Sequence, residues 1–166
     1  MAYMKGHNTL ILGLGNMLRG DDAVGIYVTM ALEKKLEDGA TVVCTEEMGL
    51  SLLDHLSGFD EAIIIDSIST AAQEMGKVHL LALADFASNG HRSNHYVGLP
   101  EAALLAQRLS LPFPETVHII GVEVVNPYTI STSLSLPMQR RLPGILKEVE
   151  DTVRGILTTG EGVDVL

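Results

Sequence analysis

The sequence predicts a three-layer α/β/α fold around a mixed, mostly parallel sheet of about five strands. Short apolar runs alternate along the chain with longer segments in which apolar residues recur at helical spacing. One run, at residues 61–66, is apolar on both faces of an extended chain and is therefore expected to be a central strand. The chain has 166 residues, of which 46% are apolar. We therefore expect a single domain over residues 1–166, with a core that needs no disulfide or structural zinc.

Five segments have the features of strands, because apolar and β-branched side chains lie between turn-forming residues. They are residues 8–13, 40–45, 61–66, 77–83 and 116–122. Helical segments separate several of these runs, and crossover helices of this kind join parallel strands.

Four segments with apolar residues at helical spacing are expected to be helices. One runs from Asp21 or Asp22 to a C-cap at Gly39, and the others cover about residues 49–56, 99–110 and 137–157. Pro100 fits the first turn of the third helix. Pro143 is expected to break or kink the last helix near its start.

The composition excludes several classes of protein. The formal net charge is −10, from 21 acidic and 11 basic side chains, which argues against a nucleic-acid partner but permits a basic protein or a metal ion. The single cysteine, Cys44, excludes an internal disulfide and fits a reducing compartment. No apolar run approaches the roughly 20 residues of a membrane span. No signal peptide is recognisable either, so we expect a cytoplasmic protein without a membrane partner.

The turn after the first predicted strand contains Gly-Leu-Gly and allows two interpretations. A dinucleotide-binding turn has the pattern Gly-x-Gly-x-x-Gly, but here the next glycine is Gly20. The acid that binds ribose is also missing from the end of the second strand, although Glu46 and Glu47 follow it. The other interpretation is a tight turn in which glycine serves the backbone alone. A nucleotide-binding oxidoreductase stays an alternative at this point.

Two aspartates and a histidine are the candidate functional residues. Asp21 and Asp22 can cap the helix that they begin, or they can face a cation. Asp66 ends the central strand, and in an open α/β sheet that edge forms the ligand crevice, so Asp22 and Asp66 can converge. A divalent cation removes the repulsion between two such carboxylates. With His95 as a third ligand, the set suits Zn, Ni, Co or Mn and keeps coordination positions open; the alternative for His95 is a surface residue.

The segment LGLGNMLRGDDAVG, at residues 12–25, resembles the opening signature of the nickel-iron hydrogenase maturation endopeptidases. That signature is a strand, Gly-x-Gly-Asn, a short loop, and an acidic pair followed by a small residue and glycine. Three later segments agree with the family in order and spacing: MGLSLLDHL at 48–56, IIIDSIS at 63–69 and SNHYVGL at 93–99. The resemblance extends from about residue 10 to residue 157.

The resemblance implies an endopeptidase that trims a C-terminal extension from a hydrogenase large-subunit precursor after nickel insertion. Asp22, Asp66 and His95 fall on the family's metal-recognising residues, which would make them both the catalytic and the metal-binding set. The nickel would be supplied by the substrate, and other divalent metals could occupy the same site. The precursor would be the partner, and a monomer would admit it most easily. A non-catalytic metal-binding assembly factor with the same fold is the second alternative.

Overall fold

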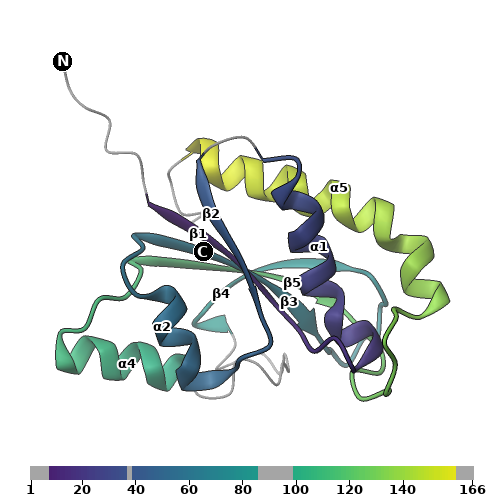
Figure 1. The fold of residues 1–166 in the computed structure, drawn as a ribbon, viewed down its shortest axis with the longest axis horizontal. Coiled ribbons are helices and arrows are strands. Elements are labelled where there is room, and N and C mark those ends of the chain that lie inside the picture. Colours follow the sequence, from purple (N-terminus) through teal and green to yellow (C-terminus); the bar gives the residue numbers. More distant parts are fainter. Residues whose placement is uncertain (1–7, 37–38, 86–98, 160–166) are drawn as a thin grey trace.

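The computed structural model describes residues 8–36, 39–85 and 99–159, which contain a five-stranded sheet (Figure 1). Its strand order is β2-β1-β3-β5-β4. The strands are β1 (Thr9–Leu14), β2 (Ala40–Thr45), β3 (Glu61–Ile68), β4 (Val78–Ala82) and β5 (Thr116–Glu123). All neighbouring strands are parallel except β4, which runs antiparallel to β5. The mixed, mostly parallel sheet is confirmed, and β3 is its central strand as predicted.

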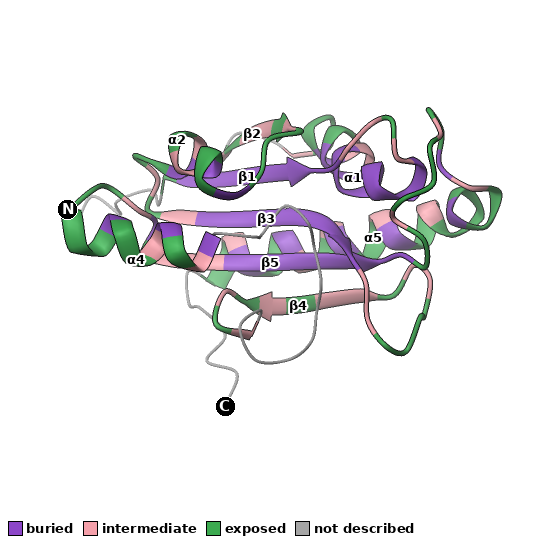
Figure 2. Cartoon of the chain, turned by 90° about the horizontal axis from the view of Figure 1, so that it is seen from below, coloured by how far each residue is buried: buried purple, intermediate pink, exposed green. Residues whose placement is uncertain are grey.

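Helices cover both faces of the sheet and complete the predicted three layers (Figures 1 and 2). On one face lie α1 (Val24–Glu33) and α5 (Leu136–Thr159), and on the other lie α2 (Leu52–Leu56) and α4 (Leu99–Leu109). Figure 2 shows that burial is greatest along β1, β3 and β5, which lie between these helix layers.

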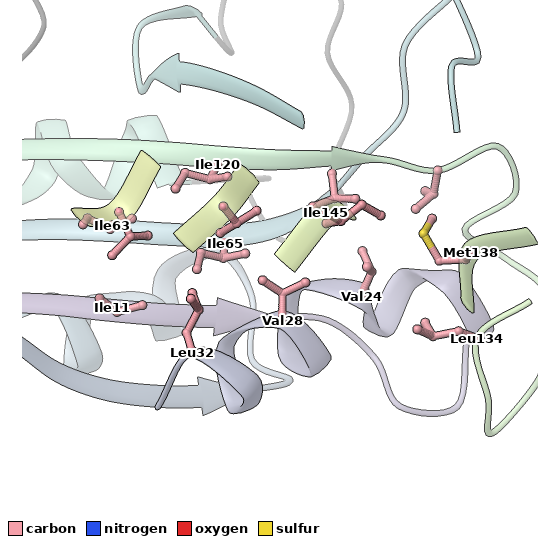
Figure 3. Close-up of a cluster of buried hydrophobic side chains, with 14 of the residues drawn as sticks. Ile11, Val24, Val28, Leu32, Ile63, Ile65, Ile120, Leu134, Met138 and Ile145 are labelled. Atoms are coloured by element: carbon pink, nitrogen blue, oxygen red, sulfur yellow. The ribbon is translucent and has the colours of Figure 1, made fainter. Parts of the chain in front are cut away.

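Alternate residues of β3 supply the two cores. Ile63 and Ile65 belong to the cluster that packs with α1 and α5, and Figure 3 shows Ile65 near Val28. Ile64, between them in sequence, packs in the second cluster with residues of α2 and α4. Successive side chains of a strand point to opposite faces, so a strand covered on both sides must be apolar throughout.

The last helix runs without interruption from Leu136 to Thr159, through Pro143, so the predicted break is wrong. Proline in a helix interior costs about 3 kcal/mol because it removes a backbone hydrogen bond. Here the helix buries one apolar side along its length, and that burial offsets the loss. The buried residues recur at helical spacing: Met138, Ile145, Val149, Val153 and Ile156.

The first helix also differs from its predicted bounds. The chain forms a 3₁₀ turn, η1 (Gly20–Ala23), before α1 begins, and α1 ends at Glu33 rather than at Gly39. The N–H groups of Lys35 and Leu36 both donate to the carbonyl oxygen of Leu32, which closes the helix early. No helix within the described residues combines the length and the hydropathy needed to cross a membrane.

A buried carboxylate joins the end of β5 to β4. Glu123 accepts hydrogen bonds from Thr70 Oγ1, from the Glu74 N–H at 2.8 Å and from His79 Nε2 at 2.9 Å. Burial by itself raises the pKa of the Glu123 carboxyl, but these hydrogen bonds and the charge of His79 outweigh it, so the pKa lies below its ordinary value.

The lowered pKa of Glu123 predicts an acid-sensitive contribution to stability. A carboxyl whose pKa is lower in the folded chain than in the unfolded chain stabilises the fold above the unfolded pKa, and the contribution is lost as the pH falls through the folded value. Glu123→Gln should therefore lower the free energy of unfolding by about 1–3 kcal/mol at pH 7. The difference in the free energy of unfolding between the wild type and Glu123→Gln should shrink in urea titrations repeated at pH 5, 4 and 3. Glu115→Gln, at an exposed position, is the control, and a deficit that is constant with pH would contradict the prediction.

Candidate functional site

The candidate site lies where β1 and β3 end side by side. The two strands are parallel and in register, with Gly13 opposite Ile65, so the loop after β1 and Asp66 reach the same edge of the sheet. The turn η1 brings the acidic pair back against the end of β3. This is the edge at which open α/β sheets bind ligands.

The glycines of this region serve close backbone packing. A Cβ atom on Gly15 would lie 2.7 Å from the carbonyl oxygen of Asp22, and one on Gly13 would lie 2.4 Å from Thr29 Oγ1. Gly25 is tighter still, because its Cβ would lie 2.3 Å from the carbonyl oxygen of Leu14. These contacts favour the backbone interpretation of Gly-Leu-Gly, in which glycine lets η1 and α1 sit directly on the strand ends.

The acids that could have served a dinucleotide are engaged elsewhere. Glu46 Oε1 accepts a hydrogen bond from the Met17 N–H at 2.7 Å and so fixes the loop after β1. Asn16 Oδ1 accepts from the Leu18 N–H at 2.9 Å in the same loop. Glu47 Oε2 lies 2.7 Å from His55 Nε2. Glu46 and Asn16 thus shape the loop that leads into the acidic pair.

Asp21 does not cap the helix that follows it. The Asp21 carboxylate instead accepts two hydrogen bonds from Ser135, at 2.7 Å from its backbone N–H and at 2.7 Å from its hydroxyl. Ser135 Oγ in turn accepts from the Met138 N–H at 3.3 Å, so it caps α5. Asp21 therefore ties η1 to the start of α5 across 114 residues of sequence.

Asp22 and Asp66 meet at Ser67. The Ser67 hydroxyl donates to Asp22 Oδ1 at 2.8 Å, and the Ser67 N–H donates to Asp66 Oδ1 at 2.7 Å. Asp22 is 3% exposed and Asp66 is 0% exposed, so both carboxylates are taken almost completely out of water. The structure thus brings together the two aspartates that the sequence singled out.

Two buried carboxylates held by one residue fit a cation site. Like charges repel strongly when they are desolvated, and a divalent cation is the usual compensation. Carboxylate oxygens suit divalent metals of the class expected here. His95 lies outside the described residues, as does the polar loop around it. Within residues 8–36, 39–85 and 99–159, no three His, Cys, Asp or Glu side chains form a group that could hold a metal.

Ser67 is a site residue that the sequence reasoning missed. It follows Asp66 in β3 and is almost completely buried, whereas serine is usually exposed. A buried hydroxyl needs a partner, so a serine inside an apolar strand next to an acid was the available signal. The partner, Asp22, lies 45 residues earlier and could not be read from the strand itself.

Comparison with known proteins gives a consistent result. The model of the hydrogenase maturation protease family matches residues 26–152, a segment that includes Asp66 and His95 and begins just after Asp22. The chain is 30% identical over 117 residues to the hydrogenase 2 maturation protease of Escherichia coli K12, covering 68% of this chain and 71% of that protein. It is 25% identical over 158 residues to the hydrogenase expression/formation protein HupD of Rhizobium leguminosarum bv. viciae, covering 93% and 76%.

Solved structures share the fold. The hydrogenase maturating endopeptidase HybD from E. coli superposes with a TM-score of 0.71 at 24% identity, covering 89% of this chain and 93% of that one. The [NiFe] hydrogenase maturation protease HybD from Thermococcus kodakarensis superposes with a TM-score of 0.67 at 24% identity, covering 87% of this chain and 98% of that one.

Proposed function

The chain belongs to the hydrogenase maturation protease family, and from that premise we propose that it removes a C-terminal extension from a nickel-iron hydrogenase large-subunit precursor after nickel insertion. Membership of the family makes it a hydrolase of peptide bonds. The observation that carries the finer proposal is the meeting of buried Asp22 and Asp66 at Ser67, on the ligand-binding edge of the sheet.

In this proposal, Asp22, Asp66 and His95 recognise the nickel that the precursor carries. Their donor atoms, two carboxylates and an imidazole, suit a divalent metal that keeps other ligands from the substrate. Docking of the metal brings the scissile bond into register with the site, so that an unloaded precursor is not cut. We further propose that the enzyme acts as a cytoplasmic monomer.

The direct test is the intact mass of a co-expressed large-subunit precursor from the same organism, with and without nickel in the medium. The proposal predicts loss of a C-terminal peptide in the presence of nickel only. Cleavage that does not depend on nickel would contradict metal recognition. No cleavage of a nickel-loaded precursor, together with a stable complex, would indicate a non-catalytic assembly factor instead.

Ser67→Ala is expected to lower kcat/KM for the precursor by about 10–100-fold, the usual effect of removing a group that holds a metal-binding side chain. The change removes the hydroxyl that fixes Asp22 but keeps the backbone N–H that contacts Asp66. Cleavage rates measured well below the melting temperature test this expectation. Ser67→Thr, which keeps the hydroxyl, should restore most of the activity.

The matched control is Ser69→Ala, two residues further along the same segment. The Ser69 hydroxyl donates to the Val124 carbonyl oxygen and is not bonded to either aspartate. Equal kcat/KM values for Ser67→Ala and Ser69→Ala would show that the Ser67 hydroxyl does not position the site.

A further inference from the structure

A cavity of about 480 Å³ opens beside the candidate site, between η1, the segment after β5 and the start of α5. Figure 1 shows that segment, in green, running past the beginning of α1. Gly20 and Asp21 line the cavity on one side, and Thr129, Ser131 and Leu136 line it on the other. The volume is within the range of pockets that hold small ligands or a few side chains.

The wall of the cavity is continuous with the backbone that carries Asp22. The Gly20 N–H donates to the Ser131 carbonyl oxygen at 2.9 Å, and the Ser131 N–H donates to the Leu18 carbonyl oxygen at 3.1 Å. The contacts between Asp21 and Ser135 close the same corner. The lining residue Asp21 is therefore the chain neighbour of Asp22, a proposed nickel-recognising residue, and backbone hydrogen bonds hold both in the same turn.

The chemistry of the cavity favours an apolar guest. Among the described residues that line it there is no Lys, Arg or His, and its one acid, Asp21, is bonded to Ser135. The remaining lining is hydroxyl, amide and apolar. The lining therefore has no cation that could bind a phosphate or a carboxylate, and both oxygens of its one carboxylate already accept hydrogen bonds from Ser135.

The lining residue Leu136 is itself exposed, and two more exposed apolar residues, Tyr128 and Ile130, lie on either side of the lining residue Thr129 in the chain. Ile130 is 90% exposed, and Tyr128 and Leu136 are each 65% exposed. A site for a small molecule closes over its ligand, whereas exposed apolar side chains around a pocket mark contact with a macromolecule. We call the cavity together with Tyr128, Ile130 and Leu136 the apolar patch.

We propose that the apolar patch binds an apolar segment of the precursor polypeptide next to the bond that is cut. This inference rests on the proposed function, since it assigns a second contact to the same substrate. The patch would fix the position of the chain while the aspartates hold the nickel, because two anchor points orient a scissile bond better than one.

Ile130→Asp tests the proposal. The variant should raise KM for the nickel-loaded precursor by about tenfold and leave kcat unchanged, since it removes binding made equally in the ground and transition states. Leu109→Asp is the matched control, because Leu109 is 60% exposed at the end of α4, in the opposite helix layer. Thr129→Phe, which fills the cavity from a second exposed position, should raise KM as well.

A photo-crosslinking residue at Tyr128 supplies an independent measurement. The proposal predicts a crosslink to an apolar segment of the precursor, located by peptide mapping. If wild-type protein cleaves the precursor but Ile130→Asp and Leu109→Asp have equal KM values, the apolar patch is not a substrate site. A crosslink only to a second copy of the chain would overturn the inference as well. Failure of the wild-type protein to cleave would instead count against the proposed function.

Discussion

Asp22→Asn and Asp66→Asn are each expected to lower kcat/KM for the nickel-loaded precursor by more than about 100-fold, because removing even an indirect partner of a metal ligand costs about 10–100-fold. Asparagine keeps the size of the side chain and an oxygen that can accept the hydrogen bond from Ser67. What it removes is the negative charge that a cation would meet. The loss should therefore be in recognition and cleavage rather than in folding.

The stability of these variants separates the two effects. Because asparagine keeps the shape of the side chain and an oxygen that accepts the hydrogen bond from Ser67, the melting temperature should stay close to that of the wild type. Asp54→Asn makes the same chemical change at an exposed position of α2 and should alter neither quantity. The measurements are intact mass of the precursor over time and thermal unfolding of each variant. Full cleavage by both site variants would exclude Asp22 and Asp66 as the functional pair.

The layer architecture was predictable because the apolar pattern of each strand matches how far that strand is buried in the sheet. The segment 40–45 coincides with β2, and the doubly apolar run that became β3 is central because both its faces meet helices. The helix ends were harder. Gly39 by itself has the features of a C-cap, but the backbone hydrogen bonds to Leu32 end α1 at Glu33. The position of a helix end depends on where the next strand must start, which the local sequence does not show.

The site was predictable to the extent that sheet topology dictates it. The convergence of Asp22 and Asp66 follows from the rule that parallel strands end at one edge, and the structure has that topology. The partners of Asp21 and Asp22 do not follow from any such rule. Ser135 and Ser67 are 114 and 45 residues away from them, and either aspartate alone fits a helix start. Only the packed chain distinguishes the structural acid, Asp21, from the candidate functional one, Asp22.

Gly25→Ala is expected to lower the free energy of unfolding by about 3 kcal/mol or more, the upper end of overpacking effects. The new Cβ would lie 2.3 Å from the Leu14 carbonyl oxygen, 2.5 Å from the Ile65 carbonyl oxygen and 2.8 Å from Asp66 Cα. All three atoms are backbone atoms of central strands, so no side-chain rotation can relieve the clash. Alanine is otherwise favoured over glycine in a helix by about 1 kcal/mol, and we expect the cost of the clash to exceed this gain in helix propensity.

The matched control is Gly155→Ala in α5, where nothing lies within 4 Å of the new Cβ. That variant should raise the free energy of unfolding by about 0.5–1 kcal/mol, so two identical substitutions in helices should shift the urea midpoint in opposite directions.

The clash at Gly25 should also push α1 and η1 away from β3, which would separate Asp22 from Ser67. The Gly25 variant should therefore lose cleavage activity even at temperatures where it stays folded. Equal stability of the two variants would show that α1 can rise off the strand ends, and a Gly25 variant that is destabilised but fully active would show that cleavage does not need Asp22 held at Ser67.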